Sequence, residues 1–155
     1  MSLPVLLSAD DDENDTFFIQ RASARFTDIF ALRQVADGRA AIDYLAGMRD
    51  FADRARFPVP ALLLLDLKMP RATGIEVVRW VREQDAFRYL PVVMLTSSSR
   101  GEDVELARQA GADVYFTKPP RPQELAQRLE ALLPALQGDR RCLSFVANNL
   151  LIDSR

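Results

Sequence analysis

The stretch Leu62-Leu63-Leu64-Leu65-Asp66 decides the fold of this chain, because it is a continuous apolar run that ends on a carboxylate. Pro60 precedes the run, and Leu67-Lys68-Met69-Pro70 and Gly74 follow it. Four consecutive leucines between turn residues are typical of a central parallel strand that is buried on both faces. In open α/β sheets the binding crevice lies beyond the carboxyl ends of such strands, so Asp66 is predicted to lie where a ligand binds. An Asp at such a position also commonly forms a turn or caps a helix.

Three further apolar segments, residues 5–9, 91–95 and 114–116, end in polar side chains in the same way. Because the carboxyl ends of parallel strands meet at one edge of a sheet, these side chains are predicted to converge with Asp66. Each of them alone also fits a solvated loop or a charged helix start, but their joint placement favours a functional site. The side chains that the four strands bring to this edge are Asp10, Asp11, Asp66, Thr96, Ser97 and Lys118.

Strand and helix patterns alternate along the chain, which predicts a doubly wound α/β fold with a parallel sheet of five strands and five helices. The remaining strand, residues 29–35, is the second along the chain; it is less apolar than the others and suits an edge position. The last helix is predicted to begin at Pro122, and Pro134 is expected to kink or stop it. The other predicted helices cover residues 13–26, 38–46, 74–84 and 102–110.

Residues 134–155 form a tail that the alternating pattern does not need. Leu143, Phe145, Val146 and the run 150–152 are too apolar to remain in solvent, so we expect the tail to order against its own domain or against a second copy of the chain. Since the chain has no room for a separate output domain, homodimerisation is the expected use.

Composition excludes several classes of protein. With 155 residues, 48% of them apolar and 27% charged, the chain fits one soluble domain. A net charge of −2 without a basic cluster argues against nucleic-acid binding. The single Cys142 excludes an internal disulfide, the apolar runs are too short to span a membrane, and no signal peptide is expected, so a cytoplasmic protein is predicted. The absence of histidine removes imidazole ligands and Ser-His or Cys-His nucleophile pairs.

Asp10, Asp11 and Asp66 at one edge create an electrostatic problem. Two unit charges 4 Å apart repel by about 1 kcal/mol in water and by about 4 kcal/mol at an effective dielectric of about 20. A hard divalent cation with oxygen ligands, of which Mg²⁺ is typical, compensates such a cluster, and Lys118 adds a further positive charge. A site balanced in this way suits transfer of a phosphoryl group to a carboxylate, with Thr96 as a hydrogen-bond donor.

With these residues in this order, the sequence resembles the receiver domains of response regulators, the phosphoacceptor modules of two-component signalling. The motifs are Asp-Asp after the first strand, Leu-Asp-Leu-Lys-Met-Pro with Gly74 behind it, Thr-Ser and Lys-Pro. The resemblance spans residues 3–133 and implies a flavodoxin-like sheet of strand order 2-1-3-4-5. It implies that Asp66 is the phosphorylated residue and that Asp10, Asp11, Asp66 and the backbone carbonyl of Lys68 hold Mg²⁺. By the same resemblance, Thr96 and Lys118 contact the phosphoryl group, and Thr96 and Tyr115 form the conformational switch.

The finer resemblance is to single-domain regulators that partner bacterial phytochromes and related sensor kinases. It is carried by Asp12-Glu13-Asn14-Asp15, Tyr44-Leu45, residues 51–58 and Val78-Arg79-Trp80-Val81-Arg82. It implies a partner sensor histidine kinase, with phytochrome-type kinases among the candidates, or a phosphotransfer protein. The chain itself would be a phosphoacceptor with self-catalysed transfer and dephosphorylation, and not an enzyme acting on other substrates.

Three alternatives compete with this interpretation. A hydrolase of the haloacid-dehalogenase type generally has a second acid two residues after its nucleophile, and Lys68 stands there instead. A nucleotide- or flavin-binding module needs a glycine- or hydroxyl-rich first turn, whereas residues 10–12 are three aspartates that repel phosphate. A receiver-like adaptor that works without phosphorylation usually lacks one of the key residues, and none is missing here; it remains the alternative.

Overall fold

The computed structural model describes residues 2–141 and 143. Its centre is a parallel sheet of five strands in the order β2-β1-β3-β4-β5, which confirms the predicted doubly wound fold. All four residues of β3 are buried, as the run of leucines predicted, whereas β2 is partly exposed at one edge. The strands are β1 (Val5–Ala9), β2 (Ala31–Val35), β3 (Leu62–Leu65), β4 (Val92–Thr96) and β5 (Val114–Thr117).

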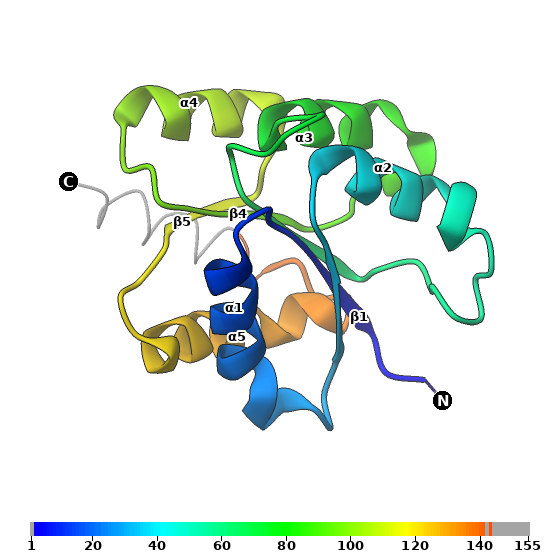
Figure 1. The fold of residues 1–155 in the computed structure, drawn as a ribbon, viewed down its shortest axis with the longest axis horizontal. Coiled ribbons are helices and arrows are strands. Elements are labelled where there is room, and N and C mark those ends of the chain that lie inside the picture. The colour runs from blue at the N-terminus through cyan, green and yellow to red at the C-terminus, as the bar shows by residue number, and fades with distance from the viewer. Residues whose placement is uncertain (1, 142, 144–155) are drawn as a thin grey trace.

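Helices cover both faces of the sheet (Figure 1). Alternate leucines of β3 divide between the two cores, so that Leu62 and Leu64 belong to one and Leu63 and Leu65 to the other. This division explains why the strand carries no polar residue, since neither of its faces meets water. The helices α2 (Gly38–Ala46), α3 (Gly74–Glu83) and α4 (Gly101–Ala110) cover one face, and α1 (Glu13–Ser23) and α5 (Pro122–Leu136) cover the other.

Several helices begin with a side-chain cap directly beyond a strand or loop. Asp12 caps α1 by accepting hydrogen bonds from the backbone N–H groups of Asn14 and Asp15. Asp37 and Thr73 cap α2 and α3 in the same manner. Because α1 starts only four residues after β1 ends, its first turn lies at the carboxyl edge of the sheet. Short 3₁₀ turns, η1 (Ala24–Phe26), η2 (Arg49–Phe51) and η3 (Asp85–Phe87), complete the connections.

The last helix is longer than the sequence suggested. Pro134 lies inside α5, which continues to Leu136, so the proline does not stop the helix. Ala135 and Leu136 are buried in the core, and this burial holds the final turn in place despite the missing N–H of the proline. The division of the chain after residue 133 stays a prediction, although α5 runs past it.

Leu143 is also buried and belongs to the same core as α1 and α5, so the segment after α5 packs against its own domain at this point. The other apolar tail residues, Phe145, Val146 and 150–152, lie outside the described residues. Across the described ranges 2–141 and 143, no helix is both long enough and apolar enough to cross a membrane.

Candidate functional site

Asp10 and Asp66 lie just beyond the carboxyl ends of the neighbouring strands β1 and β3. Backbone hydrogen bonds extend the strand ladder to both residues, from Asp66 N to Ala9 O at 3.0 Å and from Asp10 N to Val35 O at 3.2 Å. Asp66 Oδ1 accepts a hydrogen bond from Leu67 N at 2.8 Å, and only 9% of the residue is exposed. The sheet therefore fixes two nearly buried carboxylates side by side.

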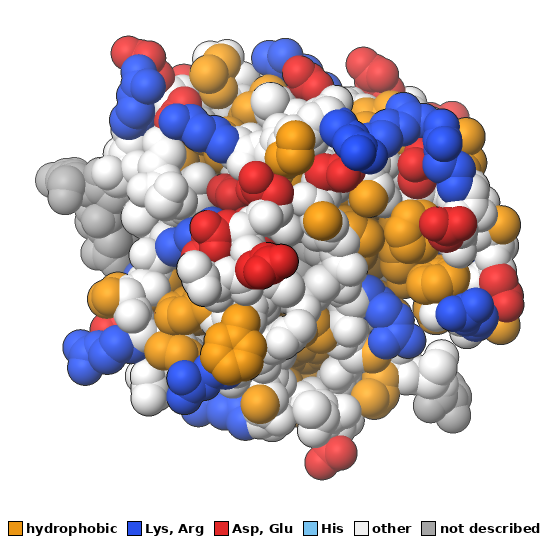
Figure 2. All heavy atoms as spheres, viewed as in Figure 1, with side chains coloured by type: hydrophobic (Ala, Val, Ile, Leu, Met, Phe, Trp, Pro, Cys, Tyr) orange, Lys and Arg blue, Asp and Glu red, His pale blue; other side chains and the backbone are white. Residues whose placement is uncertain are grey.

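Asp11 joins this pair, and carboxylate oxygens of Asp10, Asp11 and Asp66 lie within 4.8 Å of one another. Figure 2 shows acidic side chains gathered on the surface above the end of β1 and the start of α1. Burial raises the pKa of Asp10, and Lys118 and the backbone N–H of Asp12 act against this effect. An all-oxygen donor set with excess negative charge fits a hard divalent cation such as Mg²⁺.

Lys118 places its ammonium group among these carboxylates. Its Nζ lies 2.6 Å from Asp15 Oδ2, 2.9 Å from Asp10 Oδ2 and 3.5 Å from Asp66 Oδ2. Burial acts to lower the pKa of Lys118, but the hydrogen bonds to Asp15 and Asp10 and the charge of Asp66 outweigh it and raise the pKa. The lysine is therefore a permanent cation beside Asp66 at neutral pH. A backbone hydrogen bond of 2.8 Å from Lys118 N to Thr96 O ties its loop to β4.

The residues expected to form the switch are linked through Ser98. Thr96, which is almost fully buried, accepts a weak hydrogen bond of 3.4 Å from Ser98 N through its Oγ1. Tyr115 donates a hydrogen bond of 2.8 Å to Ser98 O, and the hydroxyl of Ser98 donates to Asp103 in the first turn of α4. Tyr115 is 9% exposed, so its ring is already largely buried in this state, and its role in the switch stays a prediction.

Lys68 lies two residues after Asp66, in a bend of the β3–α3 loop, with an exposed side chain. Metal binding by its carbonyl stays a prediction. Ser97 is exposed at the end of β4.

The loop that carries Asp66 requires a glycine at position 74. Gly74 N donates a hydrogen bond of 2.8 Å to Leu67 O, which closes the loop onto the start of α3. A Cβ atom at Gly74 would lie 2.3 Å from Asp66 O and 2.9 Å from Met94 Cε. Only a residue without a side chain permits this close approach, so the glycine helps to set the position of the loop that carries Asp66.

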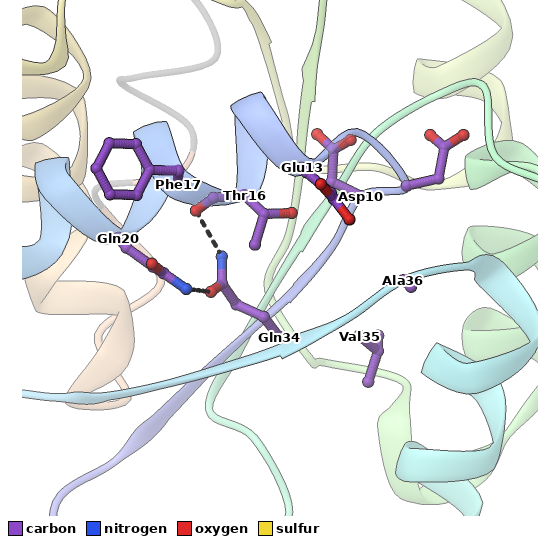
Figure 3. A pocket seen from close by; sticks show the side chains of 9 residues that line it. Asp10, Glu13, Thr16, Phe17, Gln20, Gln34, Val35 and Ala36 are labelled. Carbon is purple, nitrogen blue, oxygen red and sulfur yellow. Dashed lines mark hydrogen bonds between the residues drawn. The ribbon is translucent and has the colours of Figure 1, made fainter.

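A pocket of about 290 Å³ opens beside the acidic cluster, between α1 and β2 (Figure 3). Asp10 and Asp11 form part of its lining. Gln20 donates a hydrogen bond of 2.7 Å to Gln34 Oε1 across the gap. Gln34 in turn donates a hydrogen bond of 3.1 Å to Thr16 O. The pocket therefore reaches two of the three clustered acids.

Asp15 is the site residue that the sequence interpretation missed. It stands in the first turn of α1, and its carboxylate makes the shortest contact of the Lys118 ammonium group. The available signal was its position in the first turn of the helix, three residues after the cap Asp12, which keeps it near the edge of the sheet. That position does not reveal the partner, which is 103 residues away in sequence.

Comparison with known proteins supports one family. Residues 6–130 match the family model described as the response regulator receiver domain. The probable methanogenesis regulatory protein FilR2 of Methanothrix harundinacea is 29% identical over 128 residues, which cover 83% of this chain and 80% of that protein. The match spans only 54% of the polar-differentiation response regulator DivK of Brucella anthropi.

Solved structures agree with this assignment. Response regulator RPA3017, from red light signalling of R. palustris, has a TM-score of 0.78 at 35% identity, with 85% of this chain and 92% of that chain covered. The phosphorylated cyanobacterial phytochrome response regulator RcpA has a TM-score of 0.77 at 26% identity, with 88% and 95% covered. The Mn²⁺-bound response regulator Rcp1 has a TM-score of 0.73 at 27% identity, with 84% and 92% covered. The chain therefore belongs to the response regulator receiver domain family and resembles the regulators associated with bacterial phytochromes.

Proposed function

We propose that this chain accepts a phosphoryl group on Asp66 from a phosphohistidine of a partner protein, in a Mg²⁺-dependent transfer. The observation that carries the proposal is the environment of Asp66. Its carboxylate lies within 4.8 Å of oxygens of Asp10 and Asp11, and the Lys118 ammonium is 3.5 Å away. Such a group is a nucleophile held next to the positive charge that a phosphoryl transfer needs.

In the proposed reaction a carboxylate oxygen of Asp66 attacks phosphorus and forms the O–P bond of an acyl phosphate. The P–N bond of the donor breaks, and the imidazole leaves with a proton from solvent. The donor acts in trans, because the chain contains no histidine. Lys118 stabilises negative charge on the phosphoryl oxygens, and the hydroxyl of Thr96 donates a hydrogen bond to one of them. Asp10, Asp11, Asp66 and the carbonyl of Lys68 would hold Mg²⁺, which supplies further positive charge to the transferred group.

The output is proposed to be a change of surface around α4 and β5. If Thr96 turns its hydroxyl toward the phosphoryl group, it releases the N–H of Ser98, the residue that also holds Tyr115 and Asp103. The new charge at Asp66 would then shift the balance between two packings of the β4–α4 loop. In this form of the switch, Tyr115 keeps its buried ring and changes its hydrogen bond.

We also propose a phytochrome-type sensor kinase as the donor and a homodimer as the assembly. Support for the donor is the likeness to RPA3017 and to the phytochrome response regulator RcpA. Support for the dimer is the apolar sequence of residues 144–155. Rapid, preferential transfer from a phytochrome kinase in a profiling panel, and a dimer mass in light scattering, are the expected results.

Labelling with radioactive acetyl phosphate tests the central proposal. The wild type should acquire a base- and hydroxylamine-labile label with Mg²⁺ and none with excess EDTA. Asp66→Asn should remain unlabelled. Asp85→Asn, which changes an exposed carboxylate in η3, should label like the wild type. Full labelling of Asp66→Asn would exclude Asp66 as the acceptor, and a wild type that never labels would favour the phosphorylation-independent adaptor.

A further inference from the structure

The Lys118 ammonium group is drawn toward a carboxylate that has no assigned role. Asp15 Oδ2 lies 2.6 Å from Nζ, whereas Asp66 Oδ2 lies at 3.5 Å. The Lys118 side chain is 14% exposed and the Asp15 side chain 34%, so solvent screens this pair only in part. Of the three carboxylates around Lys118 Nζ, that of Asp66, the proposed phosphoryl acceptor, is the most distant.

The donors of the ammonium group explain why this matters. An ammonium group has three N–H donors. Asp15 and Asp10 lie within hydrogen-bond distance and occupy two of them, and the 3.5 Å separation leaves Asp66 with a weaker interaction. A phosphoryl group on Asp66 needs this same cation, so it competes with Asp15 for Lys118.

We propose that Asp15 is a positioning residue that holds Lys118 away from Asp66 and thereby slows phosphoryl transfer to it. The inference rests on the proposed function, because it concerns the rate of that reaction. Asp15 acts in two ways: it retains the lysine in the resting state, and its own charge repels the incoming phosphoryl oxygens. Both effects disappear when the carboxylate becomes a neutral amide.

The expected size follows from the geometry. Because Asp15 and Asp66 contact one ammonium group, their nearest oxygens lie no more than about 6 Å apart. Removing a unit charge at about 6 Å changes a rate by about threefold at the dielectric constant of water, about 80, and by about tenfold at an effective dielectric of about 40, which suits partly exposed side chains. Asp15→Asn should therefore be phosphorylated by acetyl phosphate about three to ten times faster than the wild type.

Two matched variants separate this effect from general causes. Glu13→Gln removes a charge from the same helical turn but leaves the three carboxylate partners of Lys118 in place. It should change the rate less than twofold. Asp15→Glu keeps the charge and should return the rate toward that of the wild type, which a merely structural role of Asp15 in α1 would not require. Melting curves establish that each variant is folded.

The experiment measures the initial rate of labelling by acetyl phosphate at saturating Mg²⁺, with Asp66→Asn as the background control. If the wild type labels and Asp66→Asn does not, the proposed function stands, and the rate of Asp15→Asn then decides the inference alone. A rate equal to or below that of the wild type would overturn the restraining role of Asp15. An equal acceleration in Glu13→Gln would also overturn it, because general charge would then explain the result. A wild type without label would instead overturn the proposed function.

Discussion

Replacing Gly74 with Ala is expected to destabilise the domain and to disturb the loop that carries Asp66. Gly74 is the first residue of α3, and an added Cβ would lie 2.3 Å from Asp66 O and 3.1 Å from Leu67 Cα. Both of these atoms belong to the backbone. Asp66 is fixed in turn by the 3.0 Å hydrogen bond from its N–H to Ala9 O, so it can move only if the end of β3 moves with it.

Two opposing free energies set the magnitude of the change. A Gly→Ala change at a tolerant helix position stabilises a protein by about 0.4–1 kcal/mol, mainly because it restricts the unfolded chain. Forcing an extra carbon into a packed site costs about 1–3 kcal/mol. Since a real Cβ essentially never approaches other atoms as closely as 2.3 Å, the upper part of that range applies. We expect a net loss of about 1–2 kcal/mol in the free energy of unfolding, or about 2–8 °C in Tm for a domain of this size.

Gly101→Ala is the matched control, because Gly101 is the first residue of α4 and a Cβ there meets nothing within 4 Å. It should raise Tm slightly. Urea unfolding and thermal melts of both variants measure the difference, and acetyl phosphate labelling of Gly74→Ala should be slower than in the control. If Gly74→Ala proves as stable as Gly101→Ala, the close approach of α3 to Asp66 is wrong.

Three further predictions concern the rest of the domain. Leu143→Ala should lower the free energy of unfolding by about 2–5 kcal/mol in urea titrations because Leu143 is buried, whereas the half-exposed Leu106→Ala should cost far less; equal effects would show that Leu143 is not packed. Asp113→Asn should cost about 1–3 kcal/mol by the same measurement, because its carboxylate pairs with two arginines at 2.9 Å, one of them mostly buried. Burial raises the pKa of Tyr115, so the folded state loses stability as the pH rises from the unfolded tyrosine value toward the raised one. Tyr115→Phe should remove a late step from the absorbance titration at alkaline pH, and an unchanged titration would contradict this.

The sequence by itself determined the sheet and the edge at which its acidic residues gather. A strand buried on both faces must be continuously apolar, so residues 62–65 identified the centre of the sheet without any tertiary information. The residues that directly follow parallel strands lie at one edge of the sheet. Asp10, Asp11, Asp66 and Lys118 do lie together there. Their chemical roles remain predictions, because placement alone does not establish reactivity.

Only the tertiary structure decided the contacts between segments that are distant in sequence. The pairing of Asp15 with Lys118 joins residues 103 positions apart, and no local pattern encodes it. The end of α5 was decided in the same way, because buried Ala135 and Leu136 extend the helix past Pro134 against the local preference of proline. Periodicity reports which face of an element is buried, whereas the choice of partner for a charge or a helix end depends on which side chains the folded sheet brings within a few ångströms.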